Sequence, residues 1–246
     1  MIRSVVVTGA AGGIGRAVVE LFAQKGWRVA GVDRAAQVDL PVGVTAYQAD
    51  VSRPDDVDRL AREVAGPLDA LVNNAAIGLN KALAETQIEE WDAVMAANAR
   101  SIFLMTRACL PALKQARGAV VNIGSVHALA TVRNTGAYAA SKGAVLALTR
   151  SMALEFGGDG IRANAVLPGA VDTPMLRRGL SRQGPSPIPE DEQLVQLGNR
   201  IALGRIGKSA EIAQAVFFLC DPDASSYVTG HGLVVDGGAT ARLGSE

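Results

Sequence analysis

The sequence predicts a single α/β domain in which helices cover both faces of a doubly wound parallel sheet. Short apolar runs alternate with longer segments whose apolar residues recur at helical spacing, the pattern of strand and helix taking turns. The strand-like runs are apolar throughout, as strands buried on both faces are. The chain has 246 residues, 49% of them hydrophobic, and 27 glycines, which suits one compact domain over residues 1–246.

The expected elements follow one another with few breaks. The run "SVVV" is the first strand, and the helix after it is marked by Ile14, Ala17, Val18, Leu21 and Phe22. Further strands are expected at "WRVAGV", "ALVNN", "AVVNI", "IRANAVL" and "GLVVD".

Helix ends carry the expected punctuation. Gly26 follows the first helical pattern, as a residue that ends a helix does. Ser52 with Asp55, and Thr86 with Glu89, resemble capping boxes at the start of two later helices.

One region fits neither period. Three prolines interrupt the stretch "GPSPIPEDEQ", residues 184–193. Long irregular connections are more often functional than idle, so residues 173–208 are a candidate substrate lid.

Composition narrows the function classes. Lys plus Arg and Asp plus Glu both number 24, and the pI is near 6.8, so neither a nucleic acid nor an anionic membrane is an expected partner. Cys109 and Cys220 lack metal-site or disulfide spacing and read as buried free thiols; we expect no metal. The chain opens directly on a strand, and no apolar run reaches membrane-spanning length, which predicts a cytoplasmic protein.

A glycine-rich turn predicts a dinucleotide site. In "VVVTGAAGGIGRAVVELF" a strand runs through Gly9, Gly13 and Gly15 into a helix whose first amides can attract a pyrophosphate. Asp33 closes the second strand, where a carboxylate can accept hydrogen bonds from the ribose hydroxyls of the adenosine. Together these features favour a Rossmann-type fold.

The turn resembles the T-G-x-x-x-G-x-G turn of the short-chain dehydrogenase/reductase family. Further motifs follow in that family's order: "NNAA", "NIGS", "YAASK", "PGAVDT" and "VDGG". Ala76 replaces a glycine of the family's N-N-A-G, and Ser101 stands where glycine is common; neither touches a reacting group. The resemblance implies cofactor contacts at Gly9, Gly13, Ile14, Gly15, Asp33, Asp50, Val51, Asn74, Ala75, Tyr138, Lys142, Pro168, Gly169, Val171 and Thr173.

The resemblance also implies hydride transfer between a nicotinamide and a carbinol carbon. Tyr138 and Lys142 lie at i and i+4 and so share one helical face. A phenol, with a reference pKa of about 10, is a poor base at pH 7. The Lys142 ammonium and an oxidised nicotinamide would both favour the phenolate, so we expect a lowered pKa for Tyr138 and a role for it as general acid/base.

Further roles come from the same resemblance. Lys142 would also bind the nicotinamide ribose, Ser125 would donate to the substrate oxygen, and Asn98 would hold a water that links Lys142 to solvent. His127 would line the substrate pocket beside Ser125 and Tyr138, as a hydrogen-bond donor or wall residue rather than a second base. Arg133, Arg177, Arg178 and Arg182 could meet an anionic substrate, although solvated arginines are the commoner case.

These expectations lead to an NAD-dependent oxidoreductase that interconverts a secondary alcohol and its ketone. Asp33 would repel the 2'-phosphate of NADP, although Arg34 could offset that repulsion. The alternatives are a reductase of 3-oxoacyl thioesters and, in another class, a dinucleotide sensor without catalysis. Apolar helices at "SIFLMTRACLPAL" and "GAVLALTRSMALEF", together with the habit of the family, predict a homotetramer.

Overall fold

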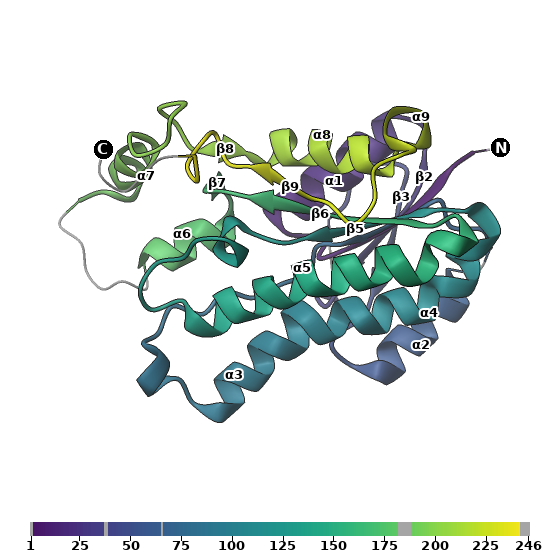
Figure 1. Ribbon diagram of the computed structural model, residues 1–246, viewed down its shortest axis with the longest axis horizontal. Helices are drawn as coiled ribbons and strands as arrows, with labels where there is room; N and C mark the ends of the chain where they lie inside the picture. The colour runs from purple at the N-terminus through teal and green to yellow at the C-terminus, as the bar shows by residue number, and fades with distance from the viewer. Residues whose placement is uncertain (1, 37–38, 65, 182–187, 242–246) are drawn as a thin grey trace.

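A parallel sheet forms the centre of the molecule (Figure 1) in the computed structural model, which describes residues 2–36, 39–64, 66–181 and 188–241. Within these residues the main sheet has seven strands in the order β3-β2-β1-β4-β5-β6-β9, each neighbouring pair parallel. Its strands are β1 Ser4–Thr8, β2 Arg28–Asp33, β3 Val44–Gln48, β4 Ala70–Asn73, β5 Ala119–Ile123, β6 Arg162–Pro168 and β9 Gly232–Val235. A second, two-stranded sheet pairs β7 Val171–Asp172 with β8 Gly207–Lys208. The predicted doubly wound architecture is confirmed.

Helices cover both faces of the main sheet. The α-helices are α1 Gly13–Gln24, α2 Pro54–Glu63, α3 Ile88–Met95, α4 Ser101–Ala116, α5 Gly136–Phe156, α6 Pro174–Ser181, α7 Glu190–Gly198, α8 Ser209–Cys220 and α9 Pro222–Ser225. Short 3-10 turns lie at η1 Leu83–Glu85, η3 Val126–Ala128 and η4 Gly157–Asp159, and a π-helix, η2 Ala96–Arg100, joins α3 to α4. Among the described residues, no helix is both long and apolar enough to cross a membrane.

Two apolar cores hold the layers together. On one face α1 and α8 pack against the sheet through residues such as Phe22 and Val216. On the other face α2, α4 and α5 do so through residues such as Leu60, Leu113 and Met152. Figure 1 shows the first pair above the sheet and the second group below it. Strands β1, β4 and β5 are buried along their whole length, which is why their sequences are mostly apolar.

The strand order reverses direction beside β1. The chain winds from β1 to β2 and β3 on one side and then to β4, β5 and β6 on the other. In such sheets ligands bind outside the carboxyl ends of the strands at this switch point. The glycine turn after β1 and the segment after β4 both lie there.

The helix starts and the candidate lid differ from the sequence predictions. The two predicted capping boxes are wrong: the Ser52 hydroxyl donates to Asp50 at 2.6 Å, and the box of α3 lies one residue later, where Glu90 accepts from the backbone N–H of Gln87 at 2.9 Å. The region 173–208 is largely helical where the structure describes it, in α6 and α7, and residues 184–187 of the proline-rich stretch lie outside the described residues.

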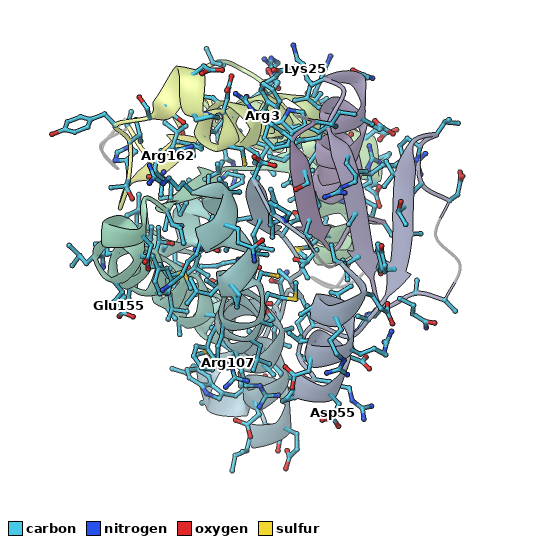
Figure 2. The ribbon with its side chains drawn as sticks, turned by 90° about the vertical axis from the view of Figure 1, so that its right-hand side faces the viewer. Arg3, Lys25, Asp55, Arg107, Glu155 and Arg162 are labelled. Atoms are coloured by element: carbon cyan, nitrogen blue, oxygen red, sulfur yellow. The ribbon has the colours of Figure 1, made fainter. Side chains whose placement is uncertain are left out.

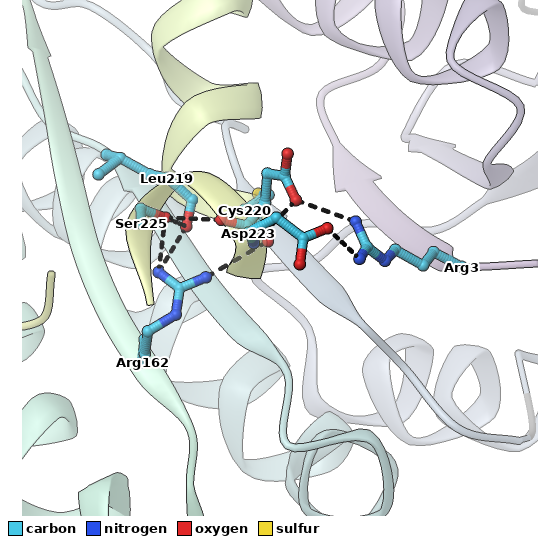
Figure 3. Close-up of polar contacts among 7 residues, drawn as sticks. Arg3, Arg162, Leu219, Cys220, Asp223 and Ser225 are labelled. Atoms are coloured by element: carbon cyan, nitrogen blue, oxygen red, sulfur yellow. Dashed lines mark hydrogen bonds and ion pairs between the residues drawn. The ribbon is translucent and has the colours of Figure 1, made fainter. Parts of the chain in front are cut away.

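Arginines tie together the edge of the sheet that lies opposite the switch point (Figure 3). Arg162, the first residue of β6, donates to the carbonyl oxygen of Leu219 near the end of α8 at 2.8 Å. A cation there satisfies carbonyls that the helix leaves unpaired. Nearby, Arg3 forms ion pairs with Asp221 and Asp223, both at 2.9 Å. The N-terminal segment, β6 and α8 are thereby joined at this edge.

Candidate active site

The glycine turn leaves its backbone open on one side. Gly9 has φ +66°, a backbone angle that residues other than glycine rarely adopt. A Cβ there would lie 2.9 Å from Ala75 Cα. A Cβ on Gly15 would collide with the carbonyl oxygen of Gly9. Gly12 N–H donates to the same oxygen at 3.1 Å and closes the turn. The spacing of the glycines therefore follows from close backbone contacts.

Asn74 and Thr8 hold this turn in place. The Asn74 side-chain amide donates to the carbonyl oxygens of Thr8 at 2.9 Å and Gly9 at 3.0 Å. The Thr8 hydroxyl accepts from the backbone N–H groups of Asn74 and Ala75 at 3.0 and 3.1 Å. Asn74 was predicted as a cofactor contact, and its amide group braces the turn. Thr8 was missing from the predicted site, although it is the threonine of the T-G motif.

A hollow of about 420 Å³ extends from the turn across the carboxyl edge of the sheet. The predicted cofactor residues that line it are Gly9, Gly13, Ile14, Asp33, Asp50, Val51, Asn74, Ala75 and Thr173. Its lining does not include Gly15, Tyr138, Lys142, Pro168, Gly169 or Val171. Gly15 lies under the turn, and Gly169 donates to the Val235 carbonyl at 3.1 Å, so these positions shape the surroundings of the hollow.

Asp33, the last residue of β2, lines the hollow. Its carboxylate accepts from the backbone N–H of Ala11 at 3.1 Å and from that of Ala35 at 3.1 Å. These bonds fix the carboxylate beside the glycine turn. Arg34 also lines the hollow, so a cation and an anion lie next to each other there.

Helix α6 and Thr173, the residue before it, form one part of the wall of the hollow. A Cβ on Gly13 would lie 2.8 Å from Thr173 Cγ2, and the Asn80 amide donates to the Gly179 carbonyl at 3.1 Å. Arg178 lines the hollow, whereas Arg177 forms ion pairs with Asp172, Glu190 and Asp191. Of the arginines predicted to meet an anionic substrate, Arg178 is the one in this hollow; Arg133 is exposed elsewhere, and Arg182 lies outside the described residues.

Ser125, Tyr138 and Lys142 come together beyond the end of β5. Ser125 follows that strand, and Tyr138 and Lys142 occupy the first turns of α5. Lys142 Nζ donates to the carbonyl oxygen of Ile123 at 2.8 Å and lies 5.6 Å from the centre of the Tyr138 ring. The predicted i, i+4 pairing is confirmed.

The electrostatics of this group differ from the prediction. Burial raises the pKa of Tyr138, and a side-chain hydrogen bond with Ser125 opposes that rise less strongly. The expected lowering of the Tyr138 pKa is therefore wrong for the protein's own groups, because desolvation of the phenolate outweighs the favourable contacts. Burial also lowers the pKa of Lys142 to about 8, so at pH 7 its ammonium is mostly retained.

Asn98 is fixed inside the π-helix. Its Oδ1 accepts from the backbone N–H of Ile77 at 2.8 Å, and its Nδ2 donates to the Ile77 carbonyl at 2.9 Å and to the Ser141 hydroxyl at 3.0 Å. The widened turn sets Asn98 among these partners, as π-turns often do at functional sites. Ser141 precedes Lys142, so Asn98 ties the segment after β4 to α5. No sequence pattern pointed to Ile77 or Ser141.

His127 lies beside Ser125 and Tyr138. Its backbone N–H donates to Ser125 Oγ at 3.2 Å, and its ring lies 5.5 Å from the Tyr138 ring, centre to centre, nearly perpendicular to it. Because Ser125 Oγ accepts that bond, its own hydrogen remains available to another acceptor. Burial lowers the pKa of His127, which favours the neutral ring.

The cysteines take no part in this site. Cys109 and Cys220 are both buried and free, and burial raises the pKa of each thiol to about 12. Among the described residues, no group of three or more His, Cys, Asp or Glu side chains could hold a metal ion.

Known proteins match this chain over almost its whole length. The sequence model of a family described as enoyl-(acyl carrier protein) reductase matches residues 9–240. The 2-(R)-hydroxypropyl-CoM dehydrogenase of Xanthobacter autotrophicus is 42% identical to this chain, and the match covers 98% of this chain and 100% of that protein. The chain belongs to the short-chain dehydrogenase/reductase family.

Two further similarities concern other members of this family. The 3-oxoacyl-(acyl-carrier-protein) reductase of Thermotoga maritima is 38% identical over 94% of this short-chain dehydrogenase/reductase and 95% of its own length. The ligand-free aldohexose dehydrogenase of Thermoplasma acidophilum matches in structure with a TM-score of 0.92 at 32% identity, covering 99% of this chain and 96% of that one. The predicted family is confirmed, and with it a nicotinamide dinucleotide, NAD or NADP, as the cofactor type.

Proposed function

We propose that this short-chain dehydrogenase/reductase interconverts a secondary alcohol and its ketone, with NAD as the cofactor and Tyr138 as the general acid/base. The alcohol would be a sugar, a polyol, or a cyclic or aliphatic alcohol. The proposal rests on one observation above all: Ser125, Tyr138 and Lys142 form one cluster at the carboxyl edge of the sheet that also carries the glycine turn.

The residues around the hollow suit a dinucleotide. Gly9, Gly12 and Gly13 line the hollow at the start of α1, where the unpaired amides of a helix N-terminus can attract a pyrophosphate. When bound, the nicotinamide supplies the hydride acceptor or donor. Residues that would hold the cofactor are those lining the hollow, with Lys142 reaching the nicotinamide ribose from α5.

Proton transfer falls to the catalytic cluster. The Tyr138 phenol exchanges a proton with the substrate oxygen, and Ser125 donates a hydrogen bond to that oxygen. Burial alone would keep the phenol protonated at neutral pH, which suits it as an acid for ketone reduction. In alcohol oxidation the positive charge of the oxidised cofactor would add to the Ser125 hydrogen bond in opposing this burial and favouring the phenolate.

Asp33 supports NAD rather than NADP. Its fixed carboxylate at the lip of the hollow is an acceptor for ribose hydroxyls and would repel a 2'-phosphate. Arg34 is the neighbouring residue that could reduce this repulsion.

Absorbance at 340 nm during incubation with NAD tests the proposal. The panel holds sugars, polyols, hydroxysteroids, cyclic alcohols, hydroxyacyl thioesters and 2-hydroxypropyl-CoM, with Tyr138→Phe as the matched control. Turnover by the wild type and not by the variant is the expected result. Cofactor binding by nicotinamide fluorescence without turnover of any substrate would favour a dinucleotide sensor instead.

A second candidate function is the reduction of 3-oxoacyl thioesters. The 38% identical relative of Thermotoga maritima with this activity in its name supports it, and Asp33 speaks against the NADPH that such reductases generally use. Faster reduction of acetoacetyl thioester with NADPH than of any simple ketone with NADH would make this the better assignment.

The exposed apolar residues support a homotetramer. Phe103 on α4 and Leu154 on α5 are 47% and 86% exposed, and Figure 2 labels Arg107 and Glu155 on the same two helices. On another part of the surface, Phe218 and Tyr227 are 41% and 101% exposed. Two separate apolar surfaces suit two different contacts between copies, as a tetramer requires.

Helix α6 is proposed as the part of the lid that covers the cofactor. Pro174, Met175 and Arg178 of α6 line the hollow, Thr173 just before the helix lies against Gly13 of the turn, and Gly179 accepts from Asn80. Arg177 links it to α7 through Glu190 and Asp191.

A further inference from the structure

A chain of three hydrogen bonds leads away from the ring of His127. His127 Nδ1 lies 2.8 Å from the Thr131 hydroxyl, which lies 2.9 Å from the Thr135 hydroxyl. The Thr135 hydroxyl in turn donates to the carbonyl oxygen of Val132 at 2.8 Å. Each link has the length of a good hydrogen bond.

The last link fixes the direction of the whole chain. The Val132 carbonyl can only accept, so it takes the single hydrogen of the Thr135 hydroxyl. Thr135 must then accept from Thr131, which uses the hydrogen of Thr131. Thr131 can only accept from His127, so His127 Nδ1 carries a hydrogen. In a neutral ring the other nitrogen, Nε2, is therefore an acceptor.

Nε2 is available to a molecule from outside. Among the described residues, the half-buried His127 ring forms its hydrogen bond through Nδ1, and Nε2 is not one of the buried side-chain atoms that lack a partner. Nε2 is therefore open to solvent. The ring stands against Tyr138, and the backbone of the same residue bonds Ser125. A substrate held by Ser125 and Tyr138 therefore has this ring as its neighbour.

We infer that His127 selects substrates that carry a second hydroxyl beside the reacting carbinol or carbonyl carbon, and that this hydroxyl donates to Nε2. The substrate class is then a vicinal diol, a polyol or the matching hydroxyketone. This inference rests on the proposed oxidoreductase function and narrows its substrate. It also reverses the sequence expectation that His127 is a donor or a mere wall residue. Thr131 is a positioning residue, since it acts through the histidine.

Nitrogen NMR tests the tautomer without any substrate. The chain has 2 histidines, so ¹⁵N-histidine labelling gives two ring systems, and His231→Gln identifies the signals of His127. At neutral pH we expect a protonated Nδ1 and an unprotonated Nε2. Thr131→Val should remove this preference, and Thr131→Ser should retain it. A protonated Nε2 with an unprotonated Nδ1 in the wild type would overturn the inference.

Matched substrates test the selectivity. We compare 2,3-butanediol with 2-butanol, which lacks the second oxygen, and with 3-methoxy-2-butanol, which keeps the oxygen and lacks its hydrogen. The diol should have at least a tenfold higher kcat/KM than either, which corresponds to about 1.4 kcal/mol. His127→Phe and Thr131→Val should each reduce that ratio, mainly by lowering kcat/KM for the diol.

The outcomes separate the two proposals. Equal kcat/KM for the diol and its methyl ether in the wild type would refute the role of Nε2, while turnover of both would leave the oxidoreductase function standing. If no alcohol or ketone is turned over, the proposed function fails, and the substrate selectivity inferred from it fails as well, whichever tautomer is observed. If His127→Phe does not fold, Thr131→Val still decides, because Thr131 is exposed and its replacement keeps the shape of the side chain.

Discussion

Replacing Lys142 by methionine should make the folded protein more stable and inactive at the same time. Lys142 is 2% exposed, and its ammonium has the Ile123 carbonyl as its hydrogen-bond partner, at 2.8 Å. A charge in such a place is costly unless it is paired. Methionine keeps the length and apolar volume of the side chain and removes the charge, so the comparison isolates that cost.

The magnitude follows from the pKa. Burial lowers the pKa of Lys142 from 10.5 to about 8, and each unit corresponds to about 1.4 kcal/mol, so folding disfavours the ammonium by about 3 kcal/mol. The lost hydrogen bond between the ammonium and the Ile123 carbonyl costs the variant about 1.5–3 kcal/mol of this gain. The Lys142→Met variant should therefore exceed the wild type in free energy of unfolding by up to about 2 kcal/mol at pH 7.

The pH dependence gives the stricter test. Between pH 8 and 10.5 the unfolded lysine holds a proton that the folded one has lost, so the stability of the wild type rises with pH relative to the variant. Below pH 8 both states are protonated and the difference is constant. The wild type should gain about 3 kcal/mol on the variant across that window, with a slope of at most about 1.4 kcal/mol per pH unit.

Urea denaturation at pH 7 to 10 measures both effects. Making the substitution in a Tyr138→Phe background removes the neighbouring phenol from the titration, and Lys25→Met serves as the control because Lys25 is exposed. The control should change stability little at any pH, since water solvates that ammonium. A difference for Lys142→Met that stays flat from pH 7 to 10, or a variant several kcal/mol less stable at pH 7, would refute the reasoning.

Three further predictions concern the chemistry, the cofactor and the assembly. Tyr138→Phe should lower turnover to below a few per cent while nicotinamide fluorescence shows nearly unchanged cofactor affinity; higher residual turnover would remove Tyr138 from the acid/base role. The wild type should have a kcat/KM at least tenfold higher with NAD than with NADP, which corresponds to a repulsion between Asp33 and the 2'-phosphate of at least about 1.4 kcal/mol. Asp33→Ala should reduce this ratio. Equal kcat/KM with both cofactors in the wild type would mean that Arg34, rather than Asp33, determines the cofactor preference. Light scattering at micromolar concentration should give the mass of a tetramer, and Leu154→Asp, at a position 86% exposed, should reduce it; a monomeric wild type contradicts the assembly.

The sequence was most informative where one physical rule dominates. Continuous apolar runs predicted β1, β4 and β5 because these strands are buried on both faces. The glycine turn could be predicted because close contacts with neighbouring atoms exclude side chains at those positions. The Tyr138–Lys142 pair could be read because helical spacing alone places both residues on one face of α5.

Features that depend on distant segments could not be predicted in the same way. The brace between Thr8 and Asn74 joins the ends of β1 and β4, and the bonds of Asn98 join the segment after β4 to α5. The direction of the Tyr138 pKa shift depends on how deeply the phenol is buried, which neither spacing nor composition reveals. Helix α3 begins one residue later than predicted because Gln87, rather than Thr86, takes the capping position.

Buried polar residues explain how the two strands beneath the site keep their register. Asn73 in β4 lies opposite Asn122 in β5 and donates to it at 2.9 Å, and Asn122 donates to Thr149 of α5 at 2.9 Å. The neighbouring positions of both strands are apolar, so apolar burial alone would tolerate a shift by two residues. Such a shift would leave both side-chain amides without partners in an apolar interior, which would cost about 1–3 kcal/mol of stability for each unsatisfied group. The polar row therefore specifies the register of β4 against β5, the strand that carries Ser125 to its place beside Tyr138.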